Sequence, residues 1–185
     1  MSSRWRLGVD DHVELVALEP NDAEQLFALI QENFDRLRPW MPWVRPESTA
    51  ADTRAFIEGV RANPNPAVRE ANGIYVDGEL AGGMGLNGDP MNAVGEIGYW
   101  IAGTHEGRGV ISRSVVALVD YGFRELGLHR IEIKAATENL RSRAIPERLG
   151  FVQEAVLREA GRTGLGFVDL VVYGMLAPEW AARQR

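Results

Sequence analysis

The chain has 185 residues, of which 45% are hydrophobic and 25% charged, a balance that suits one globular domain with a sizeable core. Its formal net charge is −6 and its sequence pI is near 5.2, which argues against general nucleic-acid binding and mildly favours a cationic acceptor such as an amine. The lack of cysteine excludes disulfides, thiolate nucleophiles and cysteine metal sites, and three scattered histidines suggest no metal site.

The first third of the chain is predicted to hold one strand and two helices. Residues 12–18 alternate apolar and polar side chains, which is the period of a strand. Pro20-Asn21-Asp22 then signals the start of a helix, and an apolar stripe follows through residues 23–30. The segment 39–46 contains three prolines and is predicted to be a loop. A second amphipathic helix is expected over about 51–62.

Three strands are predicted next. Two of them, near 68–77 and 80–87, are joined by Asp77-Gly78, a dipeptide typical of a tight hairpin turn. The third strand is Glu96–Ile101. A short connector, residues 103–109, links it to a helix whose apolar residues recur at helical spacing.

The connector 103–109 is the most informative stretch, because it places three glycines within seven residues directly before a helix. Such a turn exposes unpaired backbone N–H groups, and the helix dipole adds positive potential. Arg108 and Arg113 reinforce that sign, so the pattern predicts a site for a pyrophosphate. The chain lacks the Lys-Ser/Thr pair of a Walker motif, and Ser112 stands where a dinucleotide fingerprint needs its third glycine. Such a turn can also be only a tight strand–helix connection.

The last third is predicted to hold three more strands and a helix. Residues 128–135 form a strand pattern, and a helix is expected between Asn139 and Phe151. Strands near 150–159 and 166–176 close the chain, with a turn at 161–166. The order β-α-α-β-β-β-α-β-α-β-β suits an α/β sandwich on a mixed sheet.

Two of these motifs together resemble the GNAT acetyltransferase superfamily. The glycines of 107–109 match its pyrophosphate turn, and 139–151 (Asn-x-x-Ser-x-Ala-Ile-Pro-Glu-x-Leu-Gly-Phe) is similar to the ribosomal-protein N-acetyltransferase (RimJ/RimL-type) branch. Residues 95–100 and 37–43 resemble the same branch. The resemblance runs from about Val13 to Trp180.

The resemblance implies an α/β (α+β) fold of GNAT type, with a mixed, mostly antiparallel central sheet flanked by helices. It implies a single domain over residues 1–185, with a core at about 12–177. The implied activity is acetyl-CoA-dependent transfer of an acetyl group to a primary amine of a protein N-terminus or a small molecule. Two alternatives stay open: another acyl donor such as succinyl-CoA, and a non-catalytic acyl-CoA-binding module that regulates a partner.

The resemblance places acetyl-CoA against three segments. Its pyrophosphate is expected on the connector and first helical turn, at Gly107, Arg108, Gly109, Val110, Ile111 and Ser112. Its pantetheine arm is expected beside the end of the preceding strand, at Trp100, Ile101 and Ala102. Further contacts are expected from Asn139, Ser142 and Arg143. A β-bulge at Gly95 or Gly98 would open the strand edge for the arm.

Catalysis requires direct attack by the amine in a ternary complex, because the chain has no cysteine to form a thiol acyl-enzyme. Glu96 is the first candidate for the base that deprotonates the amine, with an ion pair as the alternative role. Glu159 is the second candidate, and Gly161 stands where related enzymes can carry a catalytic glutamate. Pro146 replaces the tyrosine that many GNAT enzymes use to protonate the thiolate. Ser142 is the expected hydroxyl donor, or else a helix N-cap.

The acceptor pocket is expected to draw on the proline-rich loop. Trp40, Met41 and Trp43 could stack on a flat or apolar acceptor, or could instead tuck into the core. Tyr99 is a further candidate. Other possible lining residues are Arg158, Asp169 and Tyr173.

The remaining expectations concern location and partners. No apolar run approaches the ~20 residues that span a bilayer, and the N-terminus lacks the apolar core of a signal peptide. A cytoplasmic protein without membrane or nucleic-acid partners is therefore expected. A homodimer is possible, but no sequence feature decides it.

Overall fold

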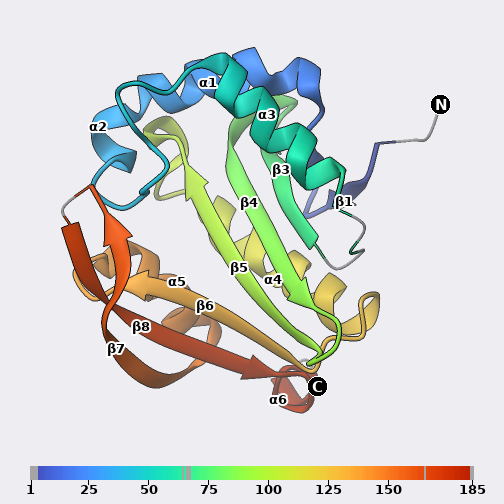
Figure 1. Ribbon diagram of the computed structural model, residues 1–185. Helices are drawn as coiled ribbons and strands as arrows, with labels where there is room; N and C mark the ends of the chain where they lie inside the picture. Colours follow the sequence, from blue (N-terminus) through green and yellow to red (C-terminus); the bar gives the residue numbers. More distant parts are fainter. Residues whose placement is uncertain (1–3, 64, 66–67, 165, 184–185) are drawn as a thin grey trace.

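A mixed sheet of eight strands forms the centre of the computed structural model, which describes residues 4–63, 65, 68–164 and 166–183 (Figure 1). The strands lie in the order β1-β2-β3-β4-β5-β6-β8-β7. Their bounds are β1 Arg6–Gly8, β2 Val13–Ala17, β3 Val68–Val76, β4 Glu79–Asp89, β5 Val94–Ile101, β6 Arg130–Ala136, β7 Val152–Thr163 and β8 Gly166–Leu176. Neighbouring strands are antiparallel except β5 and β6, which run parallel.

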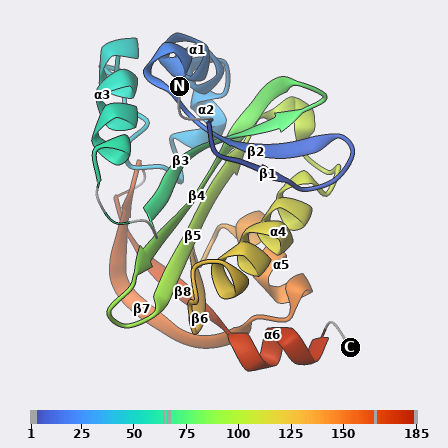
Figure 2. The same cartoon turned by 90° about the vertical axis from the view of Figure 1, so that its right-hand side faces the viewer.

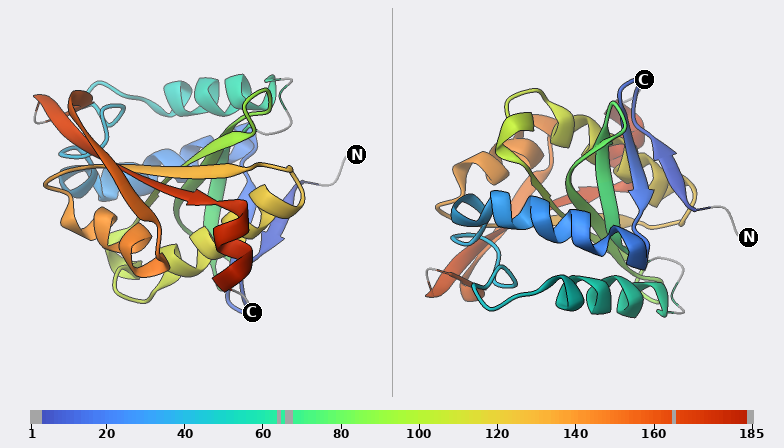
Figure 3. Two further views of the ribbon diagram at one scale, coloured as in Figure 1. Left: turned by 90° about the horizontal axis from the view of Figure 1, so that it is seen from below. Right: turned by 90° about the horizontal axis from the view of Figure 1, so that it is seen from above.

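Helices cover both faces of the sheet. Their bounds are α1 Ala23–Glu32, α2 Phe34–Leu37, α3 Ala50–Arg61, α4 Val110–Arg124, α5 Leu140–Leu149 and α6 Ala177–Arg183, with 3₁₀ turns η1 Pro20–Asp22 and η2 Gly103–His105. Figures 2 and 3 show α1 and α3 on one face and α4 and α5 on the other. One apolar cluster, with Leu118 and Ile131 at its centre, packs under α4, and a second, with Ile57, packs under α1 and α3.

Local sequence signals fix the helix ends that matter for the site. The Thr49 hydroxyl accepts from the Asp52 N–H, and the Asp52 carboxylate accepts from the Thr49 N–H, so a capping box starts α3. The Asn139 side chain accepts from the Ser142 N–H and starts α5. Gly150, with φ +76°, ends α5 in the left-handed region.

β5 and β6 pair over three residues and then separate. Their ladder runs from Val94↔Arg130 to Glu96↔Glu132, whereas β5 continues to Ile101 and β6 to Ala136. Figure 1 shows the two strands diverging beyond this point. We call the opening between residues 97–101 and 133–136 the wedge. Strand edges that lose a partner leave backbone N–H and C=O groups available to a ligand.

The fold class predicted from the sequence is confirmed, as are the longer strands and helices. The Asp77-Gly78 hairpin is present, with φ +50° and +83° at its two residues. Three short elements were not predicted: β1, α2 and α6. The turn predicted at 161–166 contains Leu165, which lies outside the described residues.

The bulge predicted at Gly95 or Gly98 is wrong. β5 pairs with β4 in one unbroken register from Gly82↔Ile101 to Asp89↔Val94. The edge of β5 is opened on its other side by the wedge, because β6 turns away. A break between parallel strands leaves no local sequence signal of the kind a bulge does.

Candidate active site

The glycine-rich connector forms an open turn at the start of α4. Gly107 and Gly109 have φ +73° and +70°, a left-handed backbone that glycine adopts without a steric penalty. Gly109 is the N-cap residue and supplies no side chain, so the N–H groups of Val110, Ile111 and Ser112 point beyond the helix end without a capping oxygen. With the helix dipole of fifteen residues behind it, the turn has the geometry of an anion site.

Two tethers hold this turn in place. Arg113 donates through Nη1 to the Arg108 carbonyl (2.8 Å) and through Nε to Asp10 (2.6 Å), so part of its charge is already paired. At the other end of the turn, Gly103 N–H donates to the buried Asn33 Oδ1 (2.9 Å). Neither tether was predicted, because Asp10 and Asn33 lie far from the turn in the sequence.

The main chain of β5 faces the wedge at alternate residues. The Ala102 N–H donates to β4 (2.8 Å), and the Trp100 carbonyl also lies against β4. Because successive residues of a strand direct their backbone groups to opposite sides, those of Tyr99 and Ile101 face the wedge. Of the three residues expected beside the pantetheine arm, Ile101 alone directs its own backbone groups there.

Ser142 and Tyr99 meet across the wedge. The Tyr99 hydroxyl donates to the Ser142 carbonyl (3.0 Å), and the Ser142 hydroxyl donates to the Tyr99 oxygen (3.4 Å). The Ser142 carbonyl is open to this contact because Pro146 lies four residues later inside α5 and has no N–H to offer. Asn139 is the N-cap, which leaves the Ser142 hydroxyl free of that role. Burial raises the pKa of Tyr99 to about 12, so its hydroxyl keeps its proton at neutral pH.

Tyr99→Phe is expected to lower the free energy of unfolding by about 1–2 kcal/mol, because the Ser142 carbonyl loses its donor. In a Pro146→Ala background, the new N–H can bond that carbonyl within the helix. The same Tyr99→Phe change should then cost less than half as much. Urea denaturation of the four proteins in this double-mutant cycle measures the difference. Equal costs in both backgrounds would show that Tyr99 does not replace the missing N–H.

Arg143 and Tyr173 form a structural link between α5 and β8. Arg143 donates to the Tyr173 hydroxyl (3.0 Å) and to the Thr137 carbonyl (2.8 Å), and Tyr173 donates to Glu147 (2.6 Å). Tyr173, named from the sequence as a possible residue of the acceptor pocket, is completely buried in the core and does not line the cavity described below. The contact between Arg143 and a cofactor stays a prediction, and its guanidinium already has three protein partners.

A cavity of about 860 Å³ lies on the face of the sheet covered by α1 and α3. Its walls include residues of α1, α3, β4, β5 and β6, the loop 40–48, and Gly161 of β7. Asn139 and Ser142, which belong to the helical layer of the opposite face, also line it. The cavity therefore extends through the wedge toward α5.

The loop 40–48, which carries two tryptophans, faces this cavity. Trp40, Met41 and Trp43 all line it, and the rings of Trp43 and Trp100 lie 6.3 Å apart at 58°. Trp43 keeps 45% of its surface exposed, so the loop does not bury it in the core. Gly83 makes room for Trp100, since a Cβ there would lie 2.6 Å from its indole nitrogen.

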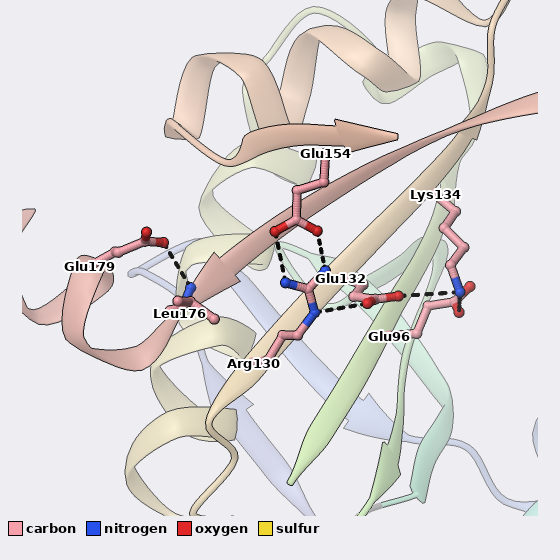
Figure 4. Close-up of polar contacts among 7 residues, drawn as sticks. All are labelled: Glu96, Arg130, Glu132, Lys134, Glu154, Leu176 and Glu179. Atoms are coloured by element: carbon pink, nitrogen blue, oxygen red, sulfur yellow. Dashed lines mark hydrogen bonds and ion pairs between the residues drawn. The ribbon is translucent and has the colours of Figure 1, made fainter. Parts of the chain in front are cut away.

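Glu96 lies in the cavity wall within a ladder of ion pairs (Figure 4). Lys134 Nζ is 2.7 Å from Glu96 Oε2 and 3.3 Å from Glu132 Oε2. Arg130 bonds Glu132 (2.8 Å) and, with two nitrogens, Glu154. The hydrogen bond that Lys134 donates to the Glu96 carboxylate raises the pKa of Lys134, so this side chain stays an ammonium. The structure thus contains the ion pair that the sequence left as the alternative role of Glu96.

The remaining candidates from the sequence lie on the β7–β8 hairpin. Glu159 is exposed at an irregularity of β7 with φ +50°, and its N–H donates to Asp169 (2.8 Å), so both residues serve the β7–β8 hairpin. Arg158 is exposed on the same strand.

Within the ranges that the structure describes, no three His, Asp or Glu side chains gather as metal ligands. No described helix is both long and apolar enough to cross a membrane.

Comparisons with known proteins agree with this geometry. A family model described as "Acetyltransferase (GNAT) domain" matches residues 12–152. The "Putative ribosomal N-acetyltransferase YdaF" of Bacillus subtilis (strain 168) is 40% identical over 177 residues, covering 93% of this chain and 95% of that protein. The "Ribosomal-protein-serine acetyltransferase" of Escherichia coli (strain K12) is 28% identical over 169 residues, covering 91% and 94%.

A solved structure is similar over nearly the same extent. The "Microcin C7 self immunity acetyltransferase MccE in complex with Acetyl-CoA and AMP" has a TM-score of 0.83 and 27% identity, covering 91% of this chain and 94% of that one.

Proposed function

The chain belongs to the GNAT acetyltransferase family, and on that premise we propose that it moves the acetyl group of acetyl-CoA to the N-terminal amine of a ribosomal protein. The observation that carries this proposal is the wedge. It joins an anion-binding turn on one face of the sheet to an acceptor-sized cavity on the other. A donor and an acceptor bound from opposite faces can meet there.

The residues of the turn fit coenzyme A. Gly109 has a left-handed backbone, and a Cβ at this position would lie 2.9 Å from the Arg113 guanidinium. Because glycine has no Cβ, the turn keeps this shape and its N–H groups stay accessible. These N–H groups bind the pyrophosphate, and the wedge-facing backbone of Tyr99 and Ile101 bonds the amides of the pantetheine arm. The similar enzyme MccE has been solved with acetyl-CoA, which supports this donor.

Acetyl-CoA supplies a thioester whose carbonyl carbon an amine can attack. The Glu96 carboxylate takes the proton of the acceptor ammonium, because it lines the cavity and stands at the last β5–β6 pair, where the wedge begins. The Ser142 hydroxyl donates a hydrogen bond to the departing sulfur, since it reaches the wedge and is not used as a cap. Without the cofactor the same hydroxyl donates to the Tyr99 oxygen, and it exchanges this partner for the sulfur when coenzyme A is bound.

The acceptor follows from the cavity and from the relatives. A volume of about 860 Å³ with Trp40, Met41 and Trp43 in its wall accommodates the first residues of a peptide. Two similar proteins carry ribosomal acceptors in their names. Free thiol should appear when acetyl-CoA meets peptides that begin with serine or alanine and copy ribosomal-protein N-termini. Thiol release with small amines only, or with succinyl-CoA in preference, would contradict the proposal.

Trp43→Ala is expected to raise the KM for the acceptor peptide about tenfold, because stacking surface of roughly 1–2 kcal/mol is lost from the cavity wall. The KM for acetyl-CoA and the midpoint of urea unfolding should hardly change, since the side chain is nearly half exposed. Steady-state kinetics with each substrate varied in turn measure both constants. A loss of stability with unchanged acceptor KM would assign the tryptophan to the core.

Three further properties are part of the proposal. The chain acts as one catalytic domain, since both apolar clusters pack on the same sheet. The cytoplasm as its location and a homodimer as its assembly stay predictions. Sedimentation velocity of the purified chain decides whether it forms a homodimer.

A further inference from the structure

Lys134 is the only lysine in a chain that has nineteen arginines. It lies in the wall of the acceptor cavity, with 29% of its side chain exposed. Every other cationic side chain except histidine is therefore a guanidinium. The single ammonium stands beside the carboxylate proposed as the base.

The position of Lys134 connects the two strands where they part. Glu96 and Glu132 form the last pair of the β5–β6 ladder, and Lys134 follows Glu132 by two residues on the same side of β6. Its Nζ reaches across to Glu96 Oε2 (2.7 Å) while staying near Glu132 Oε2 (3.3 Å). The other oxygen of Glu132 accepts from Arg130 Nε (2.8 Å), so the carboxylate of Glu132 is shared between two cations.

The two oxygens of Glu96 are used differently. Within the described part of the chain, hydrogen bonds reach Oε2 and leave Oε1 free. An ammonium is a point donor that engages one oxygen, whereas a guanidinium binds a carboxylate with two parallel N–H donors. The ladder of ion pairs in Figure 4 also contains the second mode, because Arg130 engages both oxygens of Glu154 there.

We infer that Lys134 is a positioning residue of the acceptor site, which fixes Glu96 through one oxygen and leaves the other to receive the acceptor's ammonium. This inference rests on the proposed function and names the recognition element for its substrate. The amine enters protonated and donates to Oε1 while Lys134 holds Oε2. The carboxylate then faces the wedge in one orientation as the proton is transferred.

Substitutions at position 134 separate this role from a merely structural one. Lys134→Met leaves Glu96 unheld, and Lys134→Arg keeps the charge but occupies both oxygens. Each is expected to lower kcat/KM for the acceptor peptide roughly tenfold while the Kd for coenzyme A stays unchanged. Arg124→Lys, on the exposed end of α4, is the matched control and should leave both constants unchanged. Full activity of Lys134→Arg would overturn the inference, since charge alone would then suffice.

A second measurement does not depend on turnover. Lysine-selective ¹³C labelling gives one side-chain resonance, because the chain has one lysine. With coenzyme A present, addition of a serine-terminated peptide or of n-propylamine should shift the Cε resonance in the native protein but not in Glu96→Gln. A resonance that neither amine moves would overturn the inference. If no peptide is acetylated yet the amines move the resonance, the proposed acceptor fails while the role of Lys134 stands.

Discussion

Gly109→Val is expected to raise the Kd for coenzyme A at least 100-fold. A β-branched residue is strained at φ +70°, and its Cβ would lie 2.9 Å from the Arg113 guanidinium. The turn must therefore change shape, and the N–H groups of Val110 and Ile111 lose their common direction. Each charge-assisted hydrogen bond to phosphate contributes about 1.5–3 kcal/mol, so the loss of two corresponds to about two orders of magnitude or more.

Gly127→Val is the matched control for this change. Gly127 also has a left-handed backbone, with φ +65°, but lies after α4, and no atom outside its immediate neighbours would lie within 4 Å of an added Cβ. Both variants should lose a similar 1–3 kcal/mol of stability through backbone strain. Only Gly109→Val should lose coenzyme A in isothermal titration calorimetry. Comparable affinity in the two variants would mean that the turn does not hold the pyrophosphate.

Glu96→Gln is expected to lower kcat about 100- to 10,000-fold with the peptide acceptor, because the amide of glutamine cannot take the proton from the ammonium. The substitution preserves the shape of the side chain and its reach toward Lys134. The Kd for coenzyme A should stay within about twofold of the native value, since Glu96 lies on the cavity side of β5. Pre-steady-state mixing isolates the chemical step from product release.

Glu159→Gln distinguishes the two glutamates that the sequence offered as bases. Glu159 is exposed on β7 and serves the hairpin through its backbone, so its substitution should leave kcat unchanged. A large loss in Glu159→Gln together with a fully active Glu96→Gln would reverse the assignment of the base. A loss in neither would place the proton transfer on water.

Much of the fold could be predicted from local patterns. The 3.6-residue spacing of α4, the glycines of its entry turn and the Asp77-Gly78 hairpin each carry their own signal. Asn139 and Ser142 could be placed at the start of one helix because cap and first turn are adjacent in sequence. Short elements such as β1 and α2 escaped because three or four residues show no period.

The site was less predictable, because its contacts join distant positions. The wedge depends on how β6 packs against β8, and no residue of β5 records it. The pairing of Lys134 with Glu96 spans 38 positions, although the presence of one lysine among nineteen arginines was a signal that composition alone could have supplied. Pro146 could be recognised as removing an N–H donor from α5, but the structure was needed to show that Tyr99 replaces it.

A crystal structure of the chain with coenzyme A tests the central claim most directly. We expect diphosphate oxygens within hydrogen-bond distance of backbone N–H groups of residues 107–111 and the sulfur in the wedge, between Ser142 and the Glu96 side of the cavity. Coenzyme A bound away from α4, or a sulfur that does not enter the wedge, would contradict the account.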